Sequence, residues 1–204
     1  MSRSNKIPFP RGRAAFQGDT TTLVDNEAAL AHLEGQIVYL TDTAVATPEV
    51  RRSNNDVVAK VVRNDSGGVL YAGEACKWST GYFGTRVVES SAQWNHVCGF
   101  VDDHIPSGGV QDNDLFYLII EGPAVVATKS GGTAHRTIDG TASYEQGGLM
   151  YASSEAGHVE GFASNYGDLL NNGSGAFAVT NSVGRVITTT AAASTTALID
   201  VDIR

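Results

Sequence analysis

Short runs of β-branched and aromatic residues, separated by turn-forming residues, dominate the hydrophobic pattern of this chain. The clearest run is LFYLII at residues 115–120, which lies between the polar or turn-forming residues 112–114 and 121–123. Such a short run between turn formers is typical of a strand buried on both faces. Because Pro123 cannot donate a ladder hydrogen bond, we expect residues 124–127 to begin a new strand or bend away. This segment is predicted to be the central core strand.

Other runs of the same kind predict strands along most of the chain. In the first half they cover residues 36–40, 56–63, 69–78, 85–89 and 96–101, with a longer polar connection at 41–53. In the second half they cover residues 149–152, 158–163, 177–179, 185–190 and 197–204. Regularly spaced strands without intervening helices predict an all-β fold, a small antiparallel β-barrel or β-sandwich.

One helix pattern precedes these strands, in DNEAALAHLEG at residues 25–35. Asp25 can cap its beginning, Leu30 and Leu33 share one face, and Gly35 can end it. Before it, residues 1–22 contain prolines and glycines without an apolar period, which predicts an extended arm. Residues 23–204 are expected to form a single β-rich domain.

The second half of that domain, from about residue 129, is rich in Gly, Ser, Thr and Ala. Small side chains cannot fill a thick core, so this half is expected to be looser, and either thin or packed against something else. The whole chain has 204 residues, of which 18% are charged, below the roughly 25% of typical globular proteins. We therefore expect part of its surface to contact neighbours in a homo-oligomer.

Charge separates the arm from the body. The net charge is −8, yet the first acidic residue is Asp19, and four basic residues precede it. The arm either remains a loose terminus or becomes ordered on an acidic surface of a partner, such as a neighbouring subunit. In the second case its partner-binding residues are the basic Arg3, Lys6, Arg11 and Arg13 and the apolar anchors Ile7, Phe9 and Phe16. The acidic body disfavours nucleic acid as a partner.

The sequence also bears on the compartment. No apolar segment approaches the roughly 18 residues of a membrane-spanning helix, so no membrane partner is expected. The N-terminus lacks the apolar stretch of a secretory signal, which indicates synthesis in a cytosol.

The cysteines and histidines offer little catalytic chemistry. Cys76 and Cys98 lack the spacing of a redox or zinc motif, and both are predicted to be buried free thiols. His96 and Cys98 would share one face of a strand, which is the pattern of an activated thiolate. Without an identifiable orienting group or oxyanion hole, a cysteine-dependent hydrolase remains only the alternative to a protein that is not an enzyme.

Metal and cofactor motifs are also missing from the sequence. The five histidines are scattered, and His32 has no second ligand residue at metal spacing on its face. Four acidic residues, Asp102, Asp103, Asp112 and Asp114, lie close together but lack the spacing of a calcium loop, which predicts a solvated acidic loop. We expect no cofactor.

Several segments in order resemble a known class of proteins. These are GQIVYLTD at 35–42, DVVAKVVRNDSGGVLYAGEAC at 56–76, VCGFV at 97–101, DNDLFYLIIEGPAVV at 112–126 and ALIDVDI at 197–203. With the polar arm before them and the Gly/Ala/Thr-rich half between the last two, they resemble capsid decoration proteins of tailed bacteriophages, also called cement or head-stabilising proteins.

The resemblance implies a small β-barrel or β-sandwich that assembles as a trimer on the outer capsid surface of a virion. Its partner would be the shell of major capsid protein, at three-fold or quasi-three-fold positions. The class is not catalytic, so the resemblance implies no active-site residues. A tail or fibre component with a receptor-binding role is the main alternative, although the chain shows neither the heptads nor the fixed repeat that favours a fibre.

Overall fold

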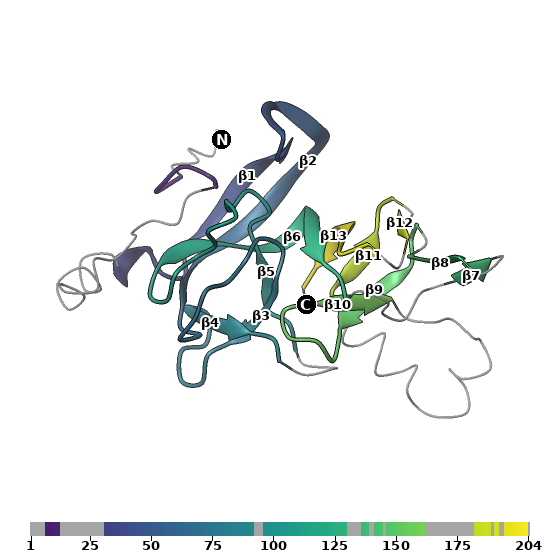
Figure 1. Ribbon diagram of the computed structural model, residues 1–204. Helices are drawn as coiled ribbons and strands as arrows, with labels where there is room; N and C mark the ends of the chain where they lie inside the picture. The colour runs from purple at the N-terminus through teal and green to yellow at the C-terminus, as the bar shows by residue number, and fades with distance from the viewer. Residues whose placement is uncertain are drawn as a thin grey trace.

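The computed structural model describes residues 7–12, 31–91, 96–129, 136–138, 141–144, 146–161, 182–188, 190–191 and 194–203. In these residues the protein is almost entirely β-structure (Figure 1). A short 3-10 helix, η1 (Ala31–Leu33), precedes the first strand, and Gly35 follows it with a left-handed φ of 85°. The rest of the predicted helix at 25–35 lies outside the described residues.

Thirteen strands follow η1 in the described parts of the chain. Ten of them form one sheet in the order β1-β2-β4-β3-β5-β6-β13-β11-β9-β10, and β12-β8-β7 form a second, small sheet. The predicted all-β class is confirmed. The strands are β1 (Ile37–Ala44), β2 (Thr47–Asn64), β3 (Ala75–Trp78), β4 (Arg86–Glu89), β5 (Gly99–Val101), β6 (Leu115–Ala127), β7 (Arg136–Ile138), β8 (Thr141–Tyr144), β9 (Leu149–Ala152), β10 (Val159–Gly161), β11 (Gly184–Val186), β12 (Thr190–Ala191) and β13 (Thr196–Asp202).

Part of the large sheet closes on itself. Because β2 also pairs with β6, the strands β2, β4, β3, β5 and β6 form a ring, which is a small barrel. All five strands contribute to one apolar cluster, the inner core, which contains Val62, Leu70, Cys76, Val87, Cys98, Val101, Ile105, Val110, Phe116 and Leu118. One strand pairing of this barrel differs from the predicted antiparallel arrangement. Strands β2 and β4 run parallel where Arg63 faces Arg86.

Strand β6 is buried on both faces, as its sequence predicts. Phe116 and Leu118 belong to the inner core, whereas Tyr117 and Ile119 belong to a second cluster, the outer core. Successive side chains of a strand point to opposite faces, so one apolar run can serve two cores. This double burial makes β6 the central strand of the described structure.

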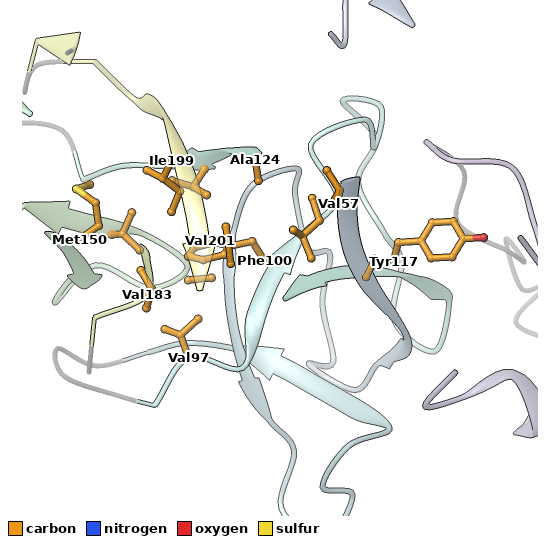
Figure 2. Close-up of a cluster of buried hydrophobic side chains, with 14 of the residues drawn as sticks. Val57, Val97, Phe100, Tyr117, Ala124, Met150, Val183, Ile199 and Val201 are labelled. Atoms are coloured by element: carbon orange, nitrogen blue, oxygen red, sulfur yellow. The ribbon is translucent and has the colours of Figure 1, made fainter. Parts of the chain in front are cut away.

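The outer core joins the first half of the chain to the second. It includes Met150 of β9, Ile199 and Val201 of β13, and Phe100 of β5. Figure 2 shows Met150, Ile199 and Val201 gathered near Phe100. Strands β9, β10, β11 and β13 of the Gly- and Ala-rich half therefore pack against the barrel of the same chain. The predicted strand at 177–179 lies outside the described residues.

Strand β6 changes its partner where the sequence predicts a break. Its first part pairs with β2 and its last part, from Glu121 to Ala127, pairs with β13. Gly122 has a φ of 95°, and a Cβ there would lie 2.6 Å from the Asp56 carbonyl oxygen. The chain thus bends out of one pairing at Gly122-Pro123, but it does so within a single strand.

Two local predictions are wrong. Residues 41–53 are not a polar connection, because β1 and β2 extend through them as a long hairpin that turns at Val45 and Ala46. A two-stranded ribbon satisfies the backbone hydrogen bonds even where its side chains are polar, so the polar composition was misleading.

The predicted strand at residues 69–78 is not one strand either. Leu70 forms an isolated bridge with Val110, a turn with Gly73 at φ 78° follows, and β3 begins at Ala75.

Candidate functional site

The described part of the arm, residues 7–12, is docked on the body of its own chain. The Phe9 ring stacks on Tyr117 of β6, with the ring centroids 4.3 Å apart and an interplanar angle of 15°. The Tyr117 hydroxyl donates to the Phe9 carbonyl oxygen at 2.6 Å and accepts from the Phe9 N–H at 3.3 Å. One tyrosine therefore binds both the side chain and the backbone of Phe9.

Arg11 holds the arm at a second point. Its Nε lies 3.1 Å from Asp102 Oδ1, and its Nη2 lies 3.0 Å from Asp103 Oδ1. Its Nη1 donates to the carbonyl oxygen of Thr41 in β1 at 2.7 Å. The guanidinium therefore connects β1 to the loop that follows β5. The fixed fork of donors in arginine suits this task.

Arg52 of β2 reaches the same place from the opposite direction. Its Nη2 lies 2.7 Å from Asp42 Oδ1, and its Nη1 lies 3.3 Å from Asp103 Oδ2. Nη2 also donates to the Pro123 carbonyl oxygen at 3.1 Å, at the bend of β6. Together Arg11, Asp42, Arg52, Asp102, Asp103 and His104 form what we call the charge cluster.

His104 completes the charge cluster. Its Nδ1 lies 2.8 Å from Asp103 Oδ1, and its Nε2 is 3.0 Å from the Thr43 hydroxyl oxygen. Burial alone would lower the pKa of His104, but its hydrogen bonds to Asp102 and Asp103 outweigh burial and raise that pKa. When His104 is protonated, three carboxylates face three cations.

Asp103 is the most heavily bonded carboxylate of the charge cluster. Burial would raise its pKa, yet hydrogen bonds from His104 and from the Val125 N–H, together with the charge of Arg11, lower the pKa to about 2. Asp103 therefore remains ionised throughout the neutral and mildly acidic range, and it bonds to four different segments of the chain.

The predicted solvated acidic loop is wrong for three of its four residues. Asp102, Asp103 and Asp114 are buried, and Asp112 alone among the four is exposed. The prediction failed because the cations that neutralise Asp102 and Asp103 come from residues 11 and 52, far away in sequence. The sequence shows where acidic residues lie, but it does not show which basic residues will neutralise them in the folded protein.

Asp102, Asp103 and His104 also place three potential metal ligands within 4.8 Å of one another. Both carboxylates already bind guanidinium groups, however, and Asp103 binds two of them. A cation would have to displace Arg11 or Arg52, so this group is better described as an ion-pair network. The absence of a cofactor stays a prediction.

Both cysteines are buried free thiols, as predicted. Burial raises the pKa of Cys98 to about 12 and that of Cys76 well above its usual value. The thiolate is the nucleophilic form, so these environments oppose thiolate chemistry at neutral pH. The predicted pairing of His96 with Cys98 on one strand face is wrong, because His96 is exposed and β5 begins only at Gly99.

A feature that the sequence pattern did not single out lies between β3 and β4. Here Phe83 is 84% exposed and Tyr82 is also exposed, while Trp78 at the end of β3 lies 5.4 Å from the Phe83 ring. We call residues 78–85 the aromatic turn. Gly81 and Gly84, with φ of 85° and 87°, flank the exposed pair. These glycines indicated a turn, but nothing in the sequence showed that its aromatic rings would remain in water.

The predicted partner-binding residues of the arm divide into three groups. Phe9 and Arg11 already have partners in their own chain, whereas Ile7 is exposed to 44%. The remaining four, Arg3, Lys6, Arg13 and Phe16, lie outside the described residues. A partner-binding role for the arm stays a prediction.

Comparison of the chain with protein-family models, with curated proteins and with solved structures found no match. In the described part of the chain, no helix has the length and apolar character needed to span a membrane.

Proposed function

We propose that this protein is a non-enzymatic structural component of a virus particle, a capsid decoration protein that binds and stabilises the outer shell as a homotrimer. The resemblance in sequence to decoration proteins of tailed phages supports this class. The fold supports it more coarsely, since a small β-barrel with an arm and a long hairpin suits surface attachment. On this proposal the chain is made in the host cytoplasm and resides on the outer capsid surface.

One structural observation carries the proposal. The chain builds two apolar cores of its own and still exposes large apolar side chains on its outlying segments. These are Ile7 of the arm, Val45 and Val50 of the β1–β2 hairpin, and Tyr82 and Phe83 of the aromatic turn. Figure 1 shows the end of that hairpin extending beyond the body. Tyr82 and Phe83 are adjacent, and an apolar patch that stays exposed is a candidate surface for contact with another protein.

Binding to particles tests the proposal directly. Purified chain is mixed with phage particles that lack it, and the particles are sedimented and imaged by cryo-electron microscopy. We expect saturable binding and three-fold density on the outer shell, with light scattering giving a trimer in solution. Unlabelled chain in excess should displace labelled chain, as a control for non-specific adsorption. A chain that does not bind to the shell at saturating concentration contradicts the proposal.

The proposal extends to the basic arm. Removing residues 1–6 deletes Arg3 and Lys6 and leaves the docked Phe9 and Arg11 in place. If the arm also contacts an acidic surface of the shell, this truncation should weaken binding at low salt and have less effect at high salt, because exposed charges are screened. Equal affinity of the full and truncated chains at both salt concentrations would limit the arm to its contacts within the chain.

A further inference from the structure

The aromatic turn is held in one conformation by its own backbone. The carbonyl oxygen of Tyr82 accepts from the N–H groups of Thr85 and Arg86, each at 3.1 Å, and the Tyr82 N–H donates to Ser79 at 3.1 Å. Ser79 in turn donates its N–H to the Arg86 carbonyl oxygen at 3.0 Å and its hydroxyl to Asp65. The exposed rings are therefore presented by an ordered turn, so little conformational freedom is lost when they are bound.

Two cations lie against the rings of the aromatic turn. Lys60 Nζ is 5.2 Å from the centre of the Trp78 ring, and the Arg86 guanidinium is 4.3 Å from that of Tyr82. Arg86 also has carboxylate neighbours, with Glu34 at 3.7 Å and Asp65 at 3.8 Å. Lys60 is half-buried, and within the described part of the chain its ammonium group has no carboxylate partner.

These side chains have the composition of an interface centre. Trp, Tyr and Arg are the residues most enriched among those that dominate binding energy, and aromatic rings bury large areas. Phe83 lies at the tip of a turn and is almost fully exposed, so the surface that receives it must be concave. A hollow that accepts a phenyl ring is lined with apolar groups, and the Lys60 ammonium against the neighbouring Trp78 ring favours negative charge at the edge of that hollow.

We propose that the aromatic turn is the docking surface for the shell, with Phe83 inserted into an apolar pocket whose rim supplies a carboxylate to Lys60. The inference rests on the proposed function and adds the site and the chemistry of its partner. The positive charge of Lys60 favours an acidic rim, and the projecting Phe83 ring favours a pocket in a protein. A glycan, by contrast, is typically stacked on an open aromatic face.

Two variants and a matched control test the inference in the particle-binding assay. Phe83→Ser removes the ring, Lys60→Glu reverses the charge, and Tyr71→Ser changes another aromatic side chain, 49% exposed, outside the aromatic turn. We expect Phe83→Ser to weaken binding at least tenfold and Lys60→Glu to weaken it mainly at low salt. Tyr71→Ser should bind within about twofold of the unaltered chain. Circular dichroism checks that each variant is folded.

The outcomes separate the inference from the function on which it rests. If the unaltered chain binds particles and Phe83→Ser binds equally well, the inference is wrong and the proposed function stands. If the unaltered chain does not bind, both are wrong. If Phe83→Ser abolishes the oligomer in light scattering, the aromatic turn is a contact between copies and its assignment to the shell is wrong. Should Phe83→Ser fail to fold, unchanged binding by Lys60→Glu at low salt overturns the inference.

Discussion

The charge cluster and the aromatic turn place their side chains in opposite ways. In the charge cluster, ionised groups are buried, with Asp42 and Asp102 fully removed from solvent. In the aromatic turn, a phenyl ring that would be stabilised by burial is left in water. Buried charges must be paired to be tolerated, and here arginines from other segments and the neighbouring His104 pair them. The Phe83 ring contacts Trp78 and still remains 84% exposed.

If the proposed function is correct, this difference separates residues that hold the fold together from residues that bind a partner. The charge cluster binds the arm, the β1–β2 hairpin, the loop after β5 and the bend of β6 to one another, so its loss should affect folding. In the aromatic turn, Trp78 packs against the inner core but Phe83 is 84% exposed, so loss of the Phe83 ring should leave the fold intact. Stability measurements can therefore test the contrast without knowledge of the partner.

The largest effect is expected when Arg52 is changed to Ala. This change leaves the buried Asp42 without its ion-pair partner and removes one of the cations at Asp103. Breaking a buried pair from one side typically costs about 3–5 kcal/mol. Urea unfolding measures the loss. Arg51→Ala is the matched control, because Arg51 is the exposed neighbour on the same strand, and it should change stability by about 0.5 kcal/mol or less. Similar losses for both variants would show that the charge cluster contributes no special stability.

Stability should fall at both ends of the pH range, along an acid limb that Asp103 causes and an alkaline limb that His104 causes. Asp103 has a pKa of about 2 in the folded protein against 3.8 ordinarily, so its contribution is present above 3.8 and is lost as pH falls toward 2. That loss is on the order of 2 kcal/mol. The pKa of His104 is raised above 6.5, so its contribution is complete below 6.5 and is lost as pH rises through the folded value.

Urea unfolding between pH 2 and pH 9 measures both limbs. His104 faces Asp102, Asp103, Arg11 and the Thr43 hydroxyl, so the protonated ring adds the third cation of the charge cluster. His104→Gln should flatten the alkaline limb and leave an acid limb, although the pKa of Asp103 will rise somewhat. If stability still falls with rising pH in His104→Gln, a group other than His104 causes that loss.

A smaller effect is expected when Tyr117 is changed to Phe. The ring that stacks on Phe9 remains, but the hydroxyl that bonds both backbone groups of Phe9 is removed. We expect the arm to dock less stably by about 1 kcal/mol, the typical contribution of such hydrogen bonds. Hydrogen exchange at the Phe9 amide measures this, with Tyr71→Phe as a control at an exposed phenol. Unchanged protection of Phe9 would show that stacking and Arg11 suffice to hold the arm.

The smallest effect on stability is expected for Phe83→Ser. The ring is almost fully exposed, so its removal should change the free energy of unfolding by about 0.5 kcal/mol or less. The same urea titration applies here. A loss above 2 kcal/mol would mean that Phe83 is part of the folded core in solution, which would remove the contrast between the two regions.

The sequence by itself determined the fold class and the position of the central strand. Alternation of apolar residues and their β-branched character are local properties, and they predicted β6, β9 and most other strands near their observed positions. The same local information predicted that Cys76 and Cys98 are buried, because both lie in strand-like apolar segments. It also located the change of partner in β6 at Gly122-Pro123, since Pro123 has no N–H to donate to a ladder.

Tertiary structure alone decided how the polar and aromatic residues are used. Burial of Asp102 and Asp103 depends on Arg11 and Arg52, and no sequence period relates residues that are 91 and 51 positions apart. Closure of β2 on β6 likewise depends on pairing between distant segments, and it creates the two separate cores. Phe83 is exposed because its turn lies at the edge of the packed body. Local pattern determines which residues can form strands, whereas long-range pairing determines which groups are neutralised and which are left exposed.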